Sequence, residues 1–243
     1  MTLISLIIPS YNESENIKKL CDKLFKIIKQ NKSVEVVIVN NGSTDKTFEI
    51  ISNHPIFKKK NFKLKNIKKN IGYGHGILKG INVASGKIIS WFHADLQVNP
   101  YDVLNAILKY KDKLINKKII VKGKRFNRSI FDYIFTFFMA KLVNFIFNSN
   151  LDDINAQPKI FNKNILKKFK NPPKDFSLDL YLLLIAHYNR FNIIQFPIYW
   201  GKRFAGVAKG GGNFIGKFKL TYRSLKYIFA LKKKLNGNNY TQS

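Results

Sequence analysis

The 243-residue sequence has little cysteine, little arginine and little acid. Its single cysteine, Cys21, excludes an internal disulfide framework and suits a reducing compartment. Only five of the 43 basic residues are arginines, which disfavours sequence-specific reading of nucleic-acid bases. Acidic residues number 14, so the net charge is +29. That charge has two interpretations: the lysine-rich composition of an AT-rich genome, or attraction to an anionic partner.

The chain shows no internal repeat and no second independent domain. Its opening residues are not expected to form a signal peptide, because no basic segment precedes the apolar run and Pro9 and Asn12 interrupt it. Hydrophobic residues make up 45% of the chain, enough for a sizeable core. We predict one α/β domain over residues 1–212, followed by a basic amphipathic tail over 213–243.

Strand and helix patterns alternate over the first hundred residues. Apolar runs predict strands, and helical spacing predicts helices between them, at 3–11, 13–30, 34–40, 45–52, 61–67, 76–84 and 87–92. This order predicts a parallel sheet with helices on both faces. Ligands of such sheets bind beyond the carboxyl ends of the strands. The polar segments PSYNE, NNGSTD and HADLQ each follow a predicted strand, so we expect them to gather at one edge.

The segment SWFHADLQVNP (90–100) turns polar where the fourth strand should end. His93, Asp95 and Gln97 occupy every second position. If strand geometry continued, the three side chains would point the same way. They are either metal ligands or simply polar residues at the point where a buried strand ends.

The second half of the chain carries an aromatic helix and a basic tail. Residues 129–149 are apolar except for a narrow polar stripe, and such a helix must be buried in protein or in lipid. In the tail, aromatic and aliphatic residues fall on one helical face among lysines, which is typical of a membrane-surface helix. We expect both segments to dock on a bilayer without crossing it. The residues of the tail's apolar face are Phe214, Phe218, Tyr222, Leu225 and Phe229.

Several motifs occur in one order along the chain: IIPSYNE, VEVVIVNNGSTDKT, NIGYGHGILKGINVASGK and HADLQVNP. Together they resemble the family 2 glycosyltransferases of GT-A fold. The later motifs GKRF (123–126), DINAQPKIF (153–161) and YWGKRFAGVAKGG (199–211) resemble the dolichyl-phosphate mannose synthase branch. The resemblance covers roughly residues 2–212. It implies a Rossmann-like, mostly parallel sheet flanked by helices, and transfer of a sugar to a polyprenyl phosphate.

The resemblance implies a nucleotide-sugar site that needs a divalent cation, Mg²⁺ or Mn²⁺, to neutralise the leaving diphosphate. Asp95 and Gln97 map to the metal side of this site. His93 replaces an acid of the family and is expected to contact either the metal's ligands or the diphosphate. Asn40 and Asn41 replace an acidic pair, which leaves the nucleotide base open. The residues that map to donor binding are Pro9, Tyr11, Glu13, Asn41, Asp45, Asn70, Gly72, Gly74, His93 and Asp95.

The resemblance also implies cations that hold an acceptor phosphate. A lipid phosphate is ionised at neutral pH, so it needs positive charge and no general base. The matching positions are Arg125, Lys159, Arg203 and Lys209. AQPK stands at Lys159 where the family often has SGFK, which leaves open how the phosphate is held. Asp179 lies near the base position of hydroxyl-transferring relatives, or is simply an acid favoured by a helix N-terminus.

We therefore expect a metal-dependent, inverting transferase that acts on a polyprenyl phosphate at the cytoplasmic membrane face, without a confident spanning helix. Its candidate catalytic residues are Asp95, Arg125, Arg203 and Asp179. One alternative transfers to a sugar hydroxyl of a glycan or lipid-linked saccharide, with Asp179 as base. The other is a non-catalytic protein that binds membrane or nucleic acid. No nucleic-acid partner is expected, because no aromatics are interleaved along an obvious single-strand groove.

Overall fold

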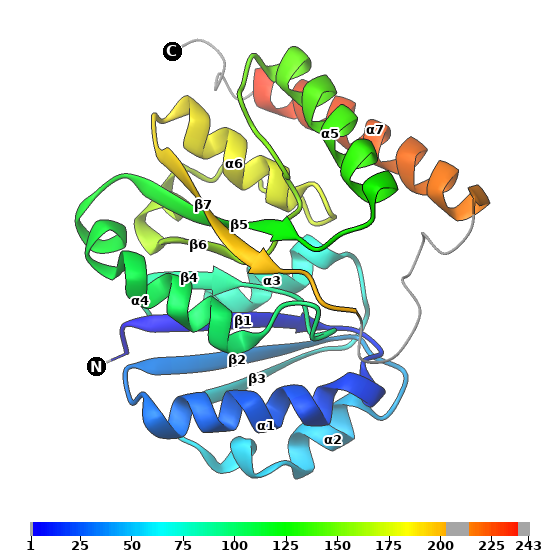
Figure 1. Cartoon of the computed structure of the whole chain (residues 1–243). Coiled ribbons are helices and arrows are strands. Elements are labelled where there is room, and N and C mark those ends of the chain that lie inside the picture. The colour runs from blue at the N-terminus through cyan, green and yellow to red at the C-terminus, as the bar shows by residue number, and fades with distance from the viewer. Residues whose placement is uncertain (1, 203–213, 238–243) are drawn as a thin grey trace.

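The computed structural model describes residues 2–202 and 214–237, so Arg203 and Lys209 lie outside the described residues. A seven-stranded sheet in the order β3-β2-β1-β4-β6-β5-β7 lies between layers of helices (Figure 1). Only β6 of these strands runs antiparallel to its neighbours, β4 and β5. The predicted α/β fold with a mostly parallel sheet is confirmed. The strands are β1 Ile4–Ser10, β2 Val34–Asn41, β3 Phe62–Ile67, β4 Ile88–Trp91, β5 Ile119–Phe126, β6 Lys159–Asn162 and β7 Asn192–Tyr199.

Each face of the sheet has its own hydrophobic core. Leu6 and Ile8 of β1 pack towards α1 and α4, whereas Ile7 between them packs towards α3 and α6. Burial on both faces explains why β1 and β2 are continuous apolar runs in the sequence. The α-helices are α1 Ser14–Gln30, α2 Thr47–Asn53, α3 Tyr73–Val83, α4 Pro100–Asn116, α5 Ile130–Phe147, α6 Leu178–Tyr188 and α7 Phe214–Gly237. Short 3₁₀ helices span Pro55–Lys58 and Lys163–Lys168.

Helix α7 lies beside α5, outside α6 (Figure 1). Its side chains Ile228, Leu231 and Leu235 are buried in the core that also contains α6. The tail is therefore packed into the fold along this side, a contact that its residue spacing did not predict. Of the predicted apolar face, Tyr222 and Phe229 are exposed, while the side chains of Phe214 and Phe218 lie outside the described residues. The helix thus has two apolar sides, and only one of them was recognised.

The packing of α7 leads to a stability prediction. Replacing the buried Leu231 by alanine should lower the free energy of unfolding by about 2–5 kcal/mol, because it leaves a cavity in the core. Replacing the exposed Phe229 by alanine on the same helix should change it by less than about 0.5 kcal/mol. Denaturant unfolding measures both values. Equal small effects would show that α7 does not pack as described.

Helix α5 is the one helix in the described ranges that is long and apolar enough to cross a membrane, by length and composition alone. Its buried residues are only Ala140, Val143 and Phe147. The sequence predicts that this helix is buried either in protein or in lipid. Burial inside this chain covers little of its apolar surface. The side chains that α5 exposes are Ile130, Phe131, Tyr133, Ile134, Phe135, Phe137, Phe138 and Phe145.

Candidate active site

A cavity of about 170 Å³ lies at the carboxyl ends of β1, β2 and β4. The polar segments after these strands do gather at one edge, as the alternating pattern predicts. Most of the predicted donor-binding residues line this cavity, together with the aromatic rings of Tyr73 and Phe176. Its lining is Pro9, Ser10, Tyr11, Glu13, Asn41, Asn70, Tyr73, His93, Ala94, Asp95 and Phe176. We call it the donor cavity.

The two asparagines at the end of β2 have different surroundings. Asn40 donates a hydrogen bond to Asn66 and accepts one from the Ser43 N–H, so its amide is used within the loop. Asn41 donates from Nδ2 to the Gly72 carbonyl at 3.0 Å, and its Oδ1 has no hydrogen-bond partner among the described residues. An asparagine side chain can offer both a donor and an acceptor to a base edge. Only the acceptor of Asn41 is left for a ligand.

The glycines of NIGYGHG pack against protein. A Cβ atom at Gly72 would lie 2.2 Å from the Lys174 carbonyl oxygen, and one at Gly74 would lie 2.7 Å from that of Asp175. Gly72 also has a φ of +139°, a conformation that favours glycine. Neither glycine lines the donor cavity, so closure of this backbone over the nucleotide stays a prediction. The helix also begins earlier than predicted, at Tyr73.

Asp45 connects the loop after β2 to the start of α1. Its carboxylate accepts hydrogen bonds from the Ser14 N–H at 3.1 Å and from the Thr47 N–H and hydroxyl. Burial by itself would raise the pKa of Asp45, but these hydrogen bonds lower it below its ordinary value. Asp45 does not line the donor cavity, so its observed role is to fix two neighbouring segments.

The segment after β4 turns instead of continuing as a strand. β4 ends at Trp91, and Leu96 has a φ of +61°. Asp95 therefore lines the donor cavity, while the Gln97 side-chain amide donates to the Gly201 carbonyl at 3.2 Å. Strand geometry therefore does not continue through His93, Asp95 and Gln97, and the three side chains have different surroundings. His93 lines the cavity and packs 5.1 Å from the Tyr73 ring, centroid to centroid.

The donor cavity can accept a cation that is bound mainly by the substrate. No group of three or more His, Cys, Asp or Glu residues within the described ranges could hold a metal. Mg²⁺ typically uses one or two carboxylates together with substrate phosphates. The buried Asp95 carboxylate supplies such a hard oxygen ligand. The residues therefore fit a cation that arrives with a diphosphate.

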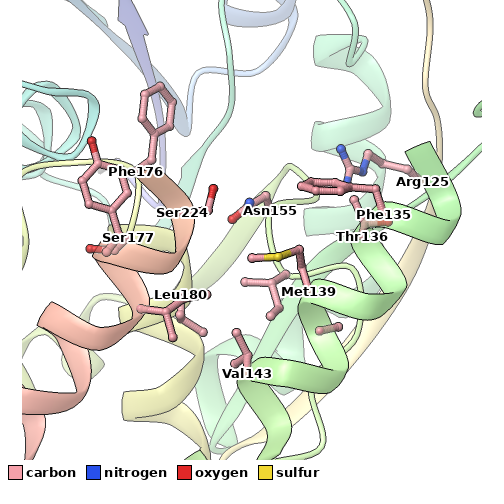
Figure 2. Close-up of a pocket in the computed structure, with 14 residues that line it drawn as sticks. Arg125, Phe135, Thr136, Met139, Val143, Asn155, Phe176, Ser177, Leu180 and Ser224 are labelled. Carbon is pink, nitrogen blue, oxygen red and sulfur yellow. The ribbon is translucent and has the colours of Figure 1, made fainter. Parts of the chain in front are cut away.

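A second, mostly apolar cavity of about 100 Å³ lies between α5, α6 and α7. In Figure 2, Met139 and Val143 of α5 face Leu180 of α6, and Arg125 lies on the α5 side. Phe176 lines both cavities and stacks on Tyr73 with ring centroids 5.0 Å apart. We call this second space the acceptor cavity, because its lining includes Arg125, which the motifs predict to hold the acceptor phosphate. The two cavities therefore share one aromatic wall.

Two arginines meet one carboxylate beside the acceptor cavity. Arg125, at the end of β5, donates to Asp153 from Nε at 3.0 Å and also from its Nη2. Arg128 donates to the same Asp153 carboxylate at 3.3 Å. Burial opposes ionisation of Asp153, but the hydrogen bonds from Arg125 lower its pKa. Arg128 belongs to none of the motifs and was not predicted, although the scarcity of arginine and its position near Arg125 could have indicated it.

Lys159 does not reach either cavity. Its side chain is fully buried, and Nζ donates to the Ala156 carbonyl at 2.5 Å and lies 3.8 Å from Asp179 Oδ1. A contact with an acceptor phosphate would require the surrounding core to rearrange. The assignment of Lys159 to the acceptor phosphate stays a prediction, to which this placement gives no support.

Asp179 is also enclosed. Its carboxylate accepts hydrogen bonds from Trp91 Nε1 at 2.8 Å and from Gln157 Nε2 at 3.0 Å, and the residue is only 2% exposed. It lines neither cavity. A general base must come within hydrogen-bonding distance of the proton that it removes, so this geometry gives no support to Asp179 as the base of a hydroxyl transfer.

The chain resembles known proteins over most of its length. It is 26% identical to the dolichyl-phosphate beta-glucosyltransferase ALG5C of Trichomonas vaginalis, over 82% of this chain and 64% of that protein. It is 25% identical to the dolichol-phosphate mannosyltransferase of Pyrococcus furiosus, over 95% of this chain and 64% of that protein. The chain thus spans slightly less than two thirds of the length of each relative.

A solved structure shares the fold. Glucosyl-3-phosphoglycerate synthase from Mycobacterium tuberculosis, in complex with Mn²⁺, uridine-diphosphate and glucosyl-3-phosphoglycerate, superposes with a TM-score of 0.69 at 15% identity. The match covers 95% of this chain and 78% of that one. The model of glycosyl transferase family 2 matches residues 5–170, well over half of the sequence. This chain therefore belongs to glycosyl transferase family 2.

Proposed function

We propose that this chain transfers a sugar from a nucleotide diphosphate to a polyprenyl phosphate, with inversion at the anomeric carbon. The observation that carries the proposal is the pair of cavities that share Phe176. One cavity is lined by the donor motifs, and the other is apolar with Arg125 in its lining. The two relatives compared above are named for transfer to dolichyl or dolichol phosphate, which supports the acceptor class.

The proposed reaction is one displacement. A phosphate oxygen of the acceptor forms a bond to the anomeric carbon while the bond from that carbon to the diphosphate breaks, and the electron pair leaves with the nucleoside diphosphate. The attacking phosphate is already ionised, so no base is required. Asp95 would hold a divalent cation, which neutralises charge on the leaving group when bound. Arg125 would hold the acceptor phosphate. Arg203 and Lys209 stay proposed phosphate contacts.

The acceptor's long hydrocarbon tail provides a reason for membrane docking. The acceptor cavity lies between α5 and α7, and α5 exposes aromatic residues next to it. We propose that these two helices lie on an anionic bilayer at the cytoplasmic face. Lysines of α7, such as Lys226, Lys232 and Lys233, are exposed and would add about 1 kcal/mol each near anionic headgroups.

Membrane docking can be tested at the exposed phenylalanines of α5. Phe131 and Phe145 are 78% and 88% exposed. Replacing both by serine should weaken binding to vesicles of phosphatidylglycerol and phosphatidylcholine by at least about tenfold, because two apolar anchors are lost. Co-sedimentation measures this change. The matched control replaces two other exposed phenylalanines by serine, Phe48 of α2 and Phe57 of the 3₁₀ helix that follows it. Equal losses in both double variants would refute docking through α5.

The proposed reaction is tested by a transfer assay on the full chain. A panel of nucleotide sugars is incubated with farnesyl phosphate and Mn²⁺, and products are analysed by mass spectrometry. We expect a glycosyl ester of the phosphate from at least one donor. Farnesol, which has a hydroxyl in place of the phosphate, should give no product. Product from farnesol, or no product from any donor, would contradict the proposal.

A further inference from the structure

Two fully buried lysines lie under the loop that borders the acceptor cavity. Lys122 of β5 and Lys159 of β6 are paired directly across the two strands and are 1% and 0% exposed. Lys122 Nζ donates to the Asp153 carbonyl at 3.0 Å and to the Gly123 carbonyl at 2.9 Å. Lys159 Nζ donates to the Ala156 carbonyl. The lysines thus hold both ends of the loop 153–156.

The same loop is contacted from its other side by Arg125 and Arg128, which share the Asp153 carboxylate. Within the described residues, Lys159 has Asp179 at 3.8 Å, and Lys122 has no carboxylate within 4.0 Å. The nearby Asp152 is half-buried and pairs with Lys124. Four basic side chains therefore surround two buried carboxylates. This leaves surplus positive charge around the loop when all four are protonated.

The surplus charge lies behind the wall of the acceptor cavity. Ile154 and Asn155 of the loop line that cavity together with Arg125. A phosphate held at Arg125 would bring the negative charge that the cluster lacks, and charges interact strongly where water is excluded. We infer that Lys122 is a positioning residue of the acceptor site. The buried positive charge of Lys122 is balanced by the acceptor phosphate, which binds on the other side of the loop 153–156. This inference rests on the proposed function.

The ionisation of Lys122 supports this role. Burial lowers its pKa to about 7, and the charges of Lys159 and Arg125 also lower it, whereas Asp153 and Asp152 raise it. The other charged groups of the cluster are Arg128 and Asp179. An added anion favours the protonated form of a lysine. Below pH 7, Lys122 is already charged before the acceptor binds. As the pH rises above 7, binding must be accompanied by proton uptake, so the contribution of Lys122 to affinity falls.

The test compares Lys122→Met with Lys124→Met, which removes an exposed charge two residues along the same strand. We expect Lys122→Met to raise KM for farnesyl phosphate about tenfold at pH 6.5, with the donor KM unchanged. The ratio of variant to wild-type KM should fall towards one at pH 9. Lys124→Met should have little effect at either pH. Methionine is apolar and of similar length, so the variant should stay folded.

A second measurement needs only the wild-type chain. Calorimetry of farnesyl phosphate binding at pH 7.5, in two buffers of different ionisation enthalpy, should show net proton uptake. Equal effects of the two methionine variants, a KM ratio independent of pH, or no proton uptake would each overturn the inference and leave sugar transfer standing. Failure of the wild type to use any polyprenyl phosphate would instead overturn the proposed function as well.

Discussion

Replacing Asp95 by asparagine should slow sugar transfer by about 10²–10³-fold. Asparagine has nearly the same shape and can still accept the hydrogen bond that Asp95 Oδ1 receives from the Gln97 N–H at 3.1 Å. It lacks the negative charge that a hard divalent cation requires, so charge on the leaving diphosphate would be poorly neutralised. The transfer assay with saturating donor and acceptor measures the change in kcat.

Binding of the nucleotide provides an independent readout for Asp95. Calorimetry of the nucleoside diphosphate should show tighter binding with Mn²⁺ for the wild type and little Mn²⁺ effect for Asp95→Asn. The matched control is Asp112→Asn, which removes an exposed carboxylate from α4. It should leave both activity and Mn²⁺ dependence unchanged. Full activity in Asp95→Asn would show that this carboxylate does not serve the donor.

Replacing Arg125 by lysine should lower kcat/KM for the acceptor by about 10²-fold while the donor KM stays unchanged. The guanidinium carries five N–H donors in a fixed plane, so it can bond Asp153 and still contact a phosphate. Its carbon Cζ also lies 5.0 Å from the centre of the Trp200 ring. A lysine at this position keeps the charge but cannot satisfy both anions. Arg125 lines the acceptor cavity and not the donor cavity, which explains why only one substrate should be affected.

The control for Arg125 is Arg190→Lys, an identical change at an exposed position after α6. It should leave all kinetic constants within about twofold of the wild type. A loss of donor affinity in Arg125→Lys would indicate that the variant disturbs the shared wall at Phe176 and does not act on the acceptor alone. An unchanged acceptor KM and kcat would show that the phosphate binds elsewhere.

Much of this molecule was predictable from local patterns. Apolar runs and helical spacing predicted the order of strands and helices, because burial on a sheet face or helix side imposes a period on neighbouring residues. The motifs after β1, β2 and β4 predicted a ligand site at the carboxyl edge, because parallel strands end there together. Pro9, Tyr11 and Asp95 indeed line the donor cavity.

Other features depend on segments that are distant in the sequence. Gly72 and Gly74 were assigned to the nucleotide, but the backbone that approaches them belongs to residues 173–175. Lys159 and Asp179 had the charges expected of site residues, but packing enclosed them. A motif records residue type and order, and it does not record which side chains neighbouring elements will cover. Burial is decided by the whole fold.

The family, the layered fold and the ligand edge could be predicted from residue patterns, because periodicity and short motifs are local properties. The fold alone reveals that α7 packs into the core, that Phe176 lines two cavities, and that Lys122 lies beneath the loop 153–156. Each of these features joins elements that are far apart in the chain. Their contacts follow from side-chain packing between layers and from charge balance in a buried environment, and neither is visible in residue spacing.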